Sequence, residues 1–377
     1  MTNTDKKTLI KETAKLIIEH SLKVQPDDRV LIRFKSEATL PLLKTLIQEI
    51  FKHGGIPFVK LVNPELEDLL TANYSEKNVE DVLKRRVFDV ENHDCFISLG
   101  YNQTFKKEKP ISTFRADYAQ ATREINTIFD KKRWVLINYP SPLDAQRLGM
   151  DYDECFDYLL NCLCVDYQEM HNNMLPLKEL MDKTKKVHIK TPDTDLTFSI
   201  EGIPSTILAG EKNLPDGEIF SAPIKESVNG IITYNVDSIY KGNIFKNISL
   251  EFKNGKVIKA SCDNNTELLN QILDQDEGAR YIGEFAFGVN PNVKKPILDT
   301  LYDEKMKGSF HIALGNCYNE SYNGNHSSIH WDMIRNMEPE NGGGQIEFDD
   351  KVVFKDGKFI LDSLQLLNYE VEQVCKK

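Results

Sequence analysis

The sequence contains no run of about 18 uncharged apolar residues, so we expect no transmembrane helix and no membrane partner. Its first residues carry charges within a periodic apolar pattern and lack the continuous apolar core of a signal peptide. The seven cysteines form no CxxC pair, and their odd number without a leader favours free thiols. Together these absences predict a cytoplasmic protein.

Two further absences narrow the class of ligand. No GxGxxG or GxxxxGK[ST] stretch opens any expected helix, which argues against the usual modes of dinucleotide and nucleoside triphosphate binding. Basic residues are outnumbered, 47 to 58, and the net charge is −11. An acidic surface repels phosphate backbones, so we expect no nucleic-acid partner.

The chain has 377 residues, of which 40% are hydrophobic, enough for about two domains with sizeable cores. In residues 1–186, apolar strand-like runs alternate with amphipathic helical stretches, one of them near 114–125. This alternation predicts an α/β domain with a parallel sheet. Residues 187–377 are rich in strand-like runs, with helices expected near 267–273 and 293–303. We therefore predict a β-rich α+β domain there, and place the catalytic function in it.

Acidic residues and histidines stand inside apolar stretches of the second half. Glu218 follows a Pro-Asp-Gly turn and precedes a strand, and Glu284 is the single carboxylate of YIGEFAFG. His311 lies between Phe and Ile in a strand. His330 and Asp332 flank a tryptophan, and in an extended chain residues i and i+2 point the same way.

Each of these residues alone has an ordinary structural explanation, such as a turn acid, a core ion pair, a hydrogen-bonded core histidine or an exposed strand end. Together they would require several separate explanations, whereas one divalent-metal site satisfies all of them. Carboxylates with histidines suit Zn, Co or Mn. A carboxylate can also bridge two such ions. Five other histidines stand alone and are expected to be structural: His20, His53, His93, His171 and His188.

Several ordered motifs make the chain similar to a known family. They include HGGIPFVKL, NLPDGEIFSAPIKESVNG, YIGEFAFGVNP, FHIALGNCY and NHSSIHWDM. By these motifs the chain resembles the thermophilic-type metalloaminopeptidases, the family of aminopeptidase T, aminopeptidase S and PepS. The resemblance covers nearly the whole chain. It implies hydrolysis of the N-terminal residue from short peptides by a homodimer with two divalent metal ions.

The resemblance also assigns roles to residues. It implies metal ligands at Glu218, Glu284, His311, His330 and Asp332, with Glu284 bridging the two ions. Tyr318, seven residues after the strand histidine, matches the family's catalytic tyrosine. The general base is left open between Glu218 and a carboxylate outside the ligand set.

Two alternatives to this enzyme remain. One is a catalytically inactive metal- or peptide-binding protein on the same scaffold. The other is a cysteine hydrolase with Cys317 as nucleophile and His311 or His326 as base. His326, four residues before His330, has helical spacing to it but matches no ligand of the family.

Overall fold

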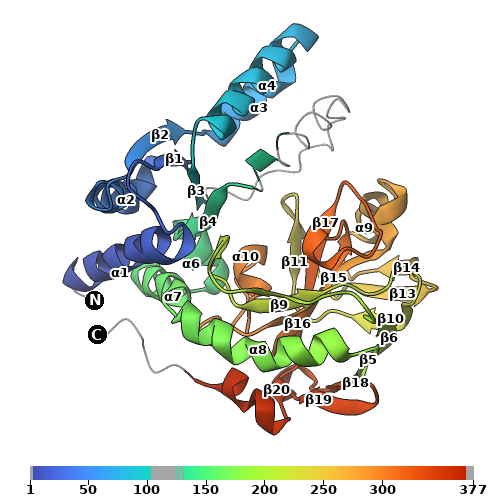
Figure 1. Cartoon of the computed structure of the whole chain (residues 1–377). Coiled ribbons are helices and arrows are strands. Elements are labelled where there is room, and N and C mark those ends of the chain that lie inside the picture. Colours follow the sequence, from blue (N-terminus) through green and yellow to red (C-terminus); the bar gives the residue numbers. More distant parts are fainter. Residues whose placement is uncertain (1–2, 103–124, 126–127, 130, 371–377) are drawn as a thin grey trace. The chain divides into compact units, whose positions relative to one another are not determined.

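The structure is a computed structural model that describes residues 3–102, 125, 128–129 and 131–370 (Figure 1). The chain forms two compact units. The first contains Met1–Cys164 and Gly210–Leu214, and the second contains Val165–Ala209 and Pro215–Val374. One unit has a parallel sheet with helices and the other has antiparallel sheets, which confirms the predicted fold class. The domain boundary near residue 186 stays a prediction.

A parallel sheet with strand order β2-β1-β3-β4-β8 forms the centre of the first unit. Its strands are β1 (Arg29–Phe34), β2 (Ile56–Leu61), β3 (Cys95–Tyr101), β4 (Arg133–Tyr139) and β8 (Asn213–Leu214). The strands form where apolar and β-branched residues are buried, and Val30 and Ile32 of β1 are fully covered. The paired strands are parallel, so the connections between them must cross the sheet, as helices do here.

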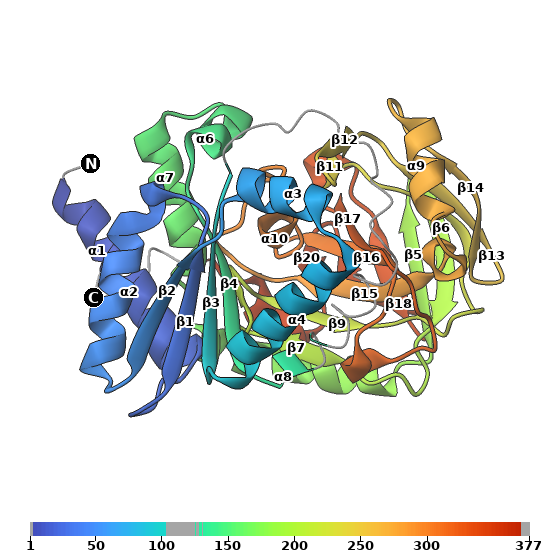
Figure 2. The same ribbon diagram turned by 90° about the horizontal axis from the view of Figure 1, so that it is seen from above.

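The helices of the first unit are α1 (Asn3–Lys15), α2 (Leu40–Lys52), α3 (Pro64–Asn73), α4 (Glu76–Glu91), α6 (Pro142–Leu148) and α7 (Tyr152–Leu163). Figure 2 shows α2 and α4 on opposite faces of the sheet. α3 was not anticipated from the sequence, although Asn63 caps its first turn by accepting bonds from Glu65 N and Leu66 N. The helix expected near 114–125 falls outside the described residues, apart from Ile125.

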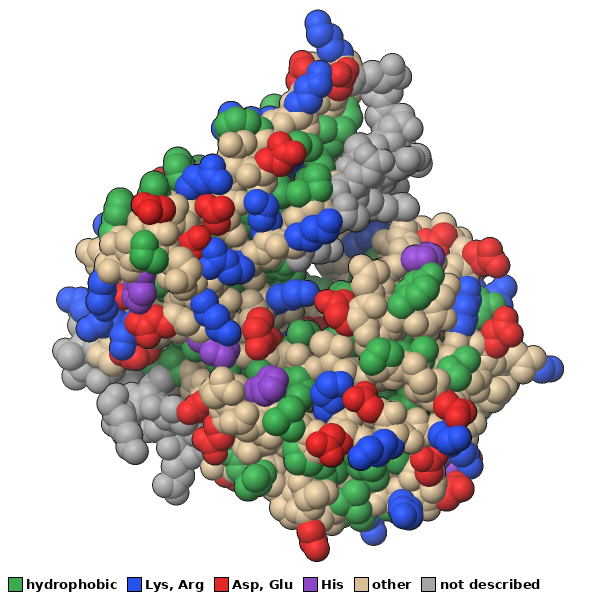
Figure 3. Space-filling view, in the orientation of Figure 1, with side chains coloured by type: hydrophobic (Ala, Val, Ile, Leu, Met, Phe, Trp, Pro, Cys, Tyr) green, Lys and Arg blue, Asp and Glu red, His purple; other side chains and the backbone are tan. Residues whose placement is uncertain are grey.

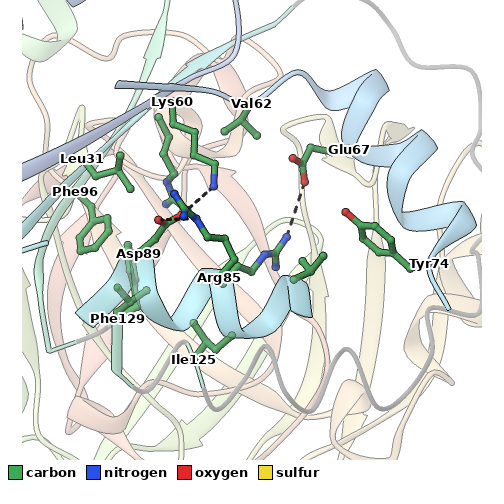
Figure 4. A pocket seen from close by; sticks show the side chains of 14 residues that line it. Leu31, Lys60, Val62, Glu67, Tyr74, Arg85, Asp89, Phe96, Ile125 and Phe129 are labelled. Carbon is green, nitrogen blue, oxygen red and sulfur yellow. Dashed lines mark hydrogen bonds and ion pairs between the residues drawn. The ribbon is translucent and has the colours of Figure 1, made fainter. Parts of the chain in front are cut away.

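A pocket of about 370 Å³ lies between the sheet of the first unit and its helices α3 and α4 (Figure 4). Its walls combine apolar side chains such as Phe96 with four cations and two carboxylates. Asp89 forms ion pairs with Lys60 at 3.0 Å and with Arg85 at 3.5 Å. Much of the pocket's charge is thus paired within it, and neither group of potential metal ligands among the described residues is found here.

Two antiparallel sheets form the second unit. The larger sheet has the order β14-β13-β10-β6-β5-β18-β19-β20. Its strands are β5 (Lys186–Thr191), β6 (Thr194–Ser199), β10 (Asn229–Thr233), β13 (Ser249–Lys253), β14 (Lys256–Ser261), β18 (Gln345–Phe348), β19 (Lys351–Lys355) and β20 (Lys358–Phe359). The smaller sheet, β17-β16-β15-β9-β7, contains β7 (Thr206–Leu208), β9 (Glu218–Ser221), β15 (Ile282–Gly288), β16 (Ser309–Gly315) and β17 (His330–Asn336).

The remaining elements of the second unit are the hairpin of β11 (Ser238–Tyr240) and β12 (Asn243–Phe245) and the helices α8 (Tyr167–Lys183), α9 (Thr266–Leu273) and α10 (Thr300–Asp303). The helix expected near 267–273 is confirmed. The helix expected over 293–303 is wrong in its first part, since only Thr300–Asp303 is helical. Pro296 has no amide hydrogen to give, and Leu298 adopts a left-handed φ of 58°, so a helix cannot run through them.

An aromatic layer joins the two sheets of the second unit. From β15, Phe285 meets Phe198 of β6 at 5.1 Å between ring centroids, and Phe287 meets Phe354 of β19 at 5.4 Å. Side chains alternate along a strand, so the residues between these phenylalanines face away from the aromatic layer. That opposite face of the smaller sheet is where Glu284 lies.

On the molecular face in Figure 3, acidic and basic side chains are interspersed.

Candidate metal centre

Strand register brings the five predicted ligands to one face of the smaller sheet. Cross-strand partners share a face, and the ladder pairs Gly288 with Glu218, Ala286 with His311, and Glu284 with Ala313. Ala313 in turn pairs with Asp332, and Gly315 pairs with His330. Residues more than 110 positions apart in sequence therefore converge, from Glu218 to Asp332.

The strand positions beside the ligands carry small residues. Ala286, Gly288, Ala313 and Gly315 occupy the same face as the acids and histidines. At Gly288 an added Cβ would lie 2.4 Å from the carbonyl oxygen of Met306, which excludes any larger side chain without a shift of the backbone. These small residues leave the long ligand side chains room to meet above the sheet.

The ligand atoms form two overlapping groups, Glu218–Glu284–His311 and Glu284–His330–Asp332, with the atoms of each within 4.8 Å of one another. Glu284 belongs to both. Its Oε1 lies 3.2 Å from His311 Nε2, and its Oε2 lies 3.5 Å from His330 Nε2. A carboxylate that presents one oxygen to each group has the geometry of a bridging ligand.

The second histidine of the centre is oriented by the backbone. His330 Nδ1 lies 2.8 Å from the carbonyl oxygen of Asn316, which can only accept, so Nδ1 carries the hydrogen. Nε2 is then directed at Asp332 Oδ1, 3.2 Å away. An imidazole fixed in this way by a carbonyl is the usual arrangement of a metal-ligating histidine.

The mutual charges of the centre shift several pKa values. Burial alone would lower the pKa of His311, but its bond to Glu284 and the charge of Glu218 raise it to about 9. Burial is likewise outweighed at His330, where Asp332 and Glu284 raise the pKa to about 10. Burial alone would raise the pKa of Asp332, but the contact with His330 holds it well below the ordinary value. The carboxylates thus attract positive charge strongly.

Three buried atoms of the centre have no hydrogen-bond partner among the described residues. They are Glu218 Oε2, Glu284 Oε2 and His311 Nδ1. Buried polar atoms normally form hydrogen bonds, and two buried carboxylate oxygens without one in a single cluster are costly. A divalent cation accepts electron pairs from such oxygens. The residues present therefore fit a metal of the Zn, Co or Mn type.

A fully buried lysine, not anticipated from the sequence, adjoins the centre. Lys305 Nζ lies 2.5 Å from Glu218 Oε1, 2.7 Å from Glu304 Oε1 and 3.7 Å from Asp216 Oδ1. Burial would lower its pKa, but these three carboxylates raise it well above the ordinary value. Burial raises the pKa of Glu304 to about 8. In sequence Lys305 stands in the charged stretch DEKMK, which reads as a surface segment.

The remaining candidate residues surround the centre unequally. The Tyr318 ring lies 4.9 Å from the imidazole of His330 and 5.5 Å from the ring of Phe220. His326 Nε2 instead pairs with the hydroxyl of Tyr322 at 2.8 Å. Cys317 Sγ donates to the carbonyl oxygen of Asn325 at 3.1 Å. Of these residues, Tyr318 is the one in ring contact with a ligand histidine.

A buried centre of three carboxylates and two histidines on an antiparallel sheet is the donor set of a divalent-metal protein. Comparison with known sequences identifies the family: the chain belongs to the thermophilic metalloprotease (M29) family, whose sequence model matches residues 6–359. The family resemblance seen in the sequence motifs is thereby confirmed.

Individual relatives are similar along most of their length. AmpS, an aminopeptidase of Bacillus subtilis (strain 168), is 28% identical over 348 residues, covering 81% of this chain and 83% of the relative. Aminopeptidase 2 of Geobacillus stearothermophilus is 22% identical over 347 residues, with the same coverage. Among solved structures, wild-type AmpT from Thermus thermophilus superposes with a TM-score of 0.78 at 20% identity, covering 94% of this chain and 99% of that one. That structure confirms the fold.

Within the described residues, no helix is both long and apolar enough to cross a membrane.

Proposed function

We propose that this chain is a metal-dependent aminopeptidase that removes N-terminal residues from short peptides, using two divalent ions. The observation that carries the two-ion proposal is the position of Glu284, whose two oxygens face two different histidines at 3.2 and 3.5 Å. Paired ions bridged by a carboxylate are the arrangement used by two-metal aminopeptidases. The names of the relatives support the choice of peptides as substrates.

The charge of the buried cluster supports two ions rather than one. Five carboxylates are buried together, namely Asp216, Glu218, Glu284, Glu304 and Asp332. When all five are ionised, which for Glu304 requires a pH above its pKa of about 8, Lys305 balances one negative charge. Two divalent ions balance the other four with both histidines neutral, as ligation requires. With a single ion, two buried negative charges would stay uncompensated, which is unfavourable in a low-dielectric site.

When bound, such a pair of ions supplies Lewis acidity and lowers the pKa of a bound water from 15.7 to about 7. The chain's own residues then hold and orient the reacting groups. Although 45% of the side chain is exposed, desolvation of its hydroxyl and the charges of Glu284 and Asp332 raise the pKa of Tyr318, so the hydroxyl stays protonated at neutral pH. It can therefore donate a hydrogen bond to the oxyanion that forms at the scissile carbonyl.

The proton acceptor is Glu218, or a carboxylate outside the ligand set. Glu304 is a carboxylate outside the ligand set. It is buried, and its pKa of about 8 is close to neutrality.

The proposal is tested by chelation and reconstitution with leucine and arginine p-nitroanilides as substrates. We expect chelator treatment to abolish cleavage and added Co²⁺ or Zn²⁺ to restore it. A protein that binds both ions and short peptides but shows no turnover would instead be the inactive binding protein.

In the alternative cysteine hydrolase, the thiol of Cys317 would be the nucleophile that attacks the substrate carbonyl. The hydrogen bond of Cys317 goes to the Asn325 carbonyl, and neither His311 nor His326 is its partner. A nucleophilic cysteine needs a base within reach. Inhibition by iodoacetamide with resistance to chelators would favour the thiol mechanism.

The homodimer and the cytoplasmic location are also proposals. β2 is an edge strand of its sheet, and it exposes Phe58, Val59 and Leu61 by 42%, 48% and 52%. An open edge with exposed apolar residues is a surface suited to pairing with a second copy. A Val59→Glu variant that elutes as a monomer, beside a dimeric parent, would support this surface.

A further inference from the structure

Among the described residues, Lys305 is the one buried cation in contact with the candidate metal centre. Its side chain is fully buried. A buried ammonium costs free energy unless it is paired, and here three carboxylates surround it. An uncharged residue would fill the same space without that cost. We therefore expect the positive charge of Lys305 to have a function.

The two oxygens of Glu218 have different surroundings. Oε1 lies 2.5 Å from Lys305 Nζ, whereas Oε2 lies 3.4 Å from His311 Nε2. Oε2 is also one of the buried oxygens without a hydrogen-bond partner among the described residues. Lys305 thus holds one oxygen of Glu218 away from the ligand cluster and leaves the other facing it.

The backbone of Lys305 fixes the same region. Its carbonyl oxygen accepts from Asn290 N at 2.9 Å, just beyond the end of β15. Asn290 in turn donates from Nδ2 to the carbonyl oxygen of Asp216 at 2.7 Å. Lys305 is therefore attached both to the turn that precedes Glu218 and to the strand that carries Glu284.

The contacts of Lys305 are one-sided. Among the described residues it forms ion pairs with Asp216, Glu218 and Glu304, and none of these belongs to the group Glu284–His330–Asp332. Its charge reaches that group only at longer range, where it helps to lower the pKa of Asp332. Removing the ammonium should therefore disturb one half of the centre more than the other.

We propose that Lys305 is a positioning residue that orients Glu218 for the ion held by Glu218, Glu284 and His311. The inference rests on the proposed two-ion function. Residues that orient metal ligands in this way typically change metal affinity by about 10–100-fold when they are replaced. Loss of Lys305 weakens one ion by this factor and leaves the ion at Glu284, His330 and Asp332 tightly bound.

The test is a Co²⁺ titration of the chelator-stripped full chain against a competing chromophoric chelator, comparing the parent with Lys305→Met. Methionine has nearly the volume of lysine but a slightly shorter side chain and no charge. We expect two tight ions in the parent, and one tight ion plus one weakened about 10–100-fold in the variant. The visible spectrum of the first cobalt equivalent should be the same in both proteins.

Arg335→Met is the matched control, because Arg335 is also a buried cation of the second unit but pairs with Asp193 at 2.8 Å. It should lower the melting temperature and keep two tight ions. Lys305→Gln is the second variant. It can still donate to Glu218, so it should recover part of the lost affinity. It also serves if the methionine variant does not fold.

The outcomes separate the two levels of the proposal. Two tight ions with unchanged affinity in folded Lys305→Met or Lys305→Gln would overturn the positioning role alone. Equal weakening of both ions would also overturn it, because the effect would then be general. A parent protein that binds no cobalt would instead refute the proposed function.

Discussion

Replacing Tyr318 with phenylalanine removes a single hydroxyl from the candidate centre. The ring contacts with His330 at 4.9 Å and Phe220 at 5.5 Å involve the ring itself, so phenylalanine can keep them. The hydroxyl stays protonated because its local desolvation and the neighbouring carboxylates raise its pKa. The substitution therefore deletes a hydrogen-bond donor with little change in shape.

The size of the effect follows from that role. Loss of one donor to an oxyanion costs about 10²–10³ in turnover, equivalent to roughly 2.7–4 kcal/mol of transition-state stabilisation. We expect this fall in kcat for leucine p-nitroanilide, with an unchanged metal content and melting temperature. The assay is steady-state kinetics on protein whose metal content has been measured.

Tyr322→Phe is the control, because Tyr322 is similarly exposed, 47% against 45% for Tyr318, and bonds to His326. It should keep its kcat within about twofold, the small effect typical of exposed positions. Two results would refute the reasoning about Tyr318. Undiminished turnover in Tyr318→Phe would show that no donor is needed there, and loss of metal would show that the residue serves the ligand set.

Four other predictions concern the ligands and the core. Glu284→Gln replaces the shared carboxylate by a neutral amide, and metal analysis should find that it retains fewer than two ions. The pKa values of about 9 and 10 at His311 and His330 mean that ions must displace protons from both. Apparent metal affinity should therefore rise between pH 6 and 9, and a pH-independent Kd would contradict this. In the stripped protein these two raised values stabilise the fold below about pH 6.5, and this contribution is lost as pH rises through 9 and 10. Phe287→Ala empties a fully buried site in the aromatic layer, and denaturant unfolding should show a loss of about 3–5 kcal/mol.

The strands were the part of the fold that sequence patterns predicted most directly. Runs such as RVLIRF and CFISLGY are strands of a parallel sheet whose central apolar residues are buried. The helix predicted over 293–303 was wrong in its first part. The left-handed backbone at Leu298 is fixed by local geometry that composition does not reveal.

The site residues that could be predicted were the polar ones that stand inside apolar stretches of the sequence. Glu284 and His311 stand inside apolar strands, where a charged or polar side chain needs an explanation. That they meet Glu218 and Asp332 depends on strand register, which the sequence alone did not specify. Lys305 was missed because its burial comes from tertiary packing, while its neighbours in sequence are charged.

The central claim is that two divalent ions at one buried centre support cleavage of N-terminal residues. The most direct test measures metal content and p-nitroanilide hydrolysis on the same samples of purified, stripped and reconstituted protein. We expect about two ions per chain at full activity, no activity after stripping, and recovery that follows the return of Co²⁺ or Zn²⁺. Full activity in metal-free protein would contradict it.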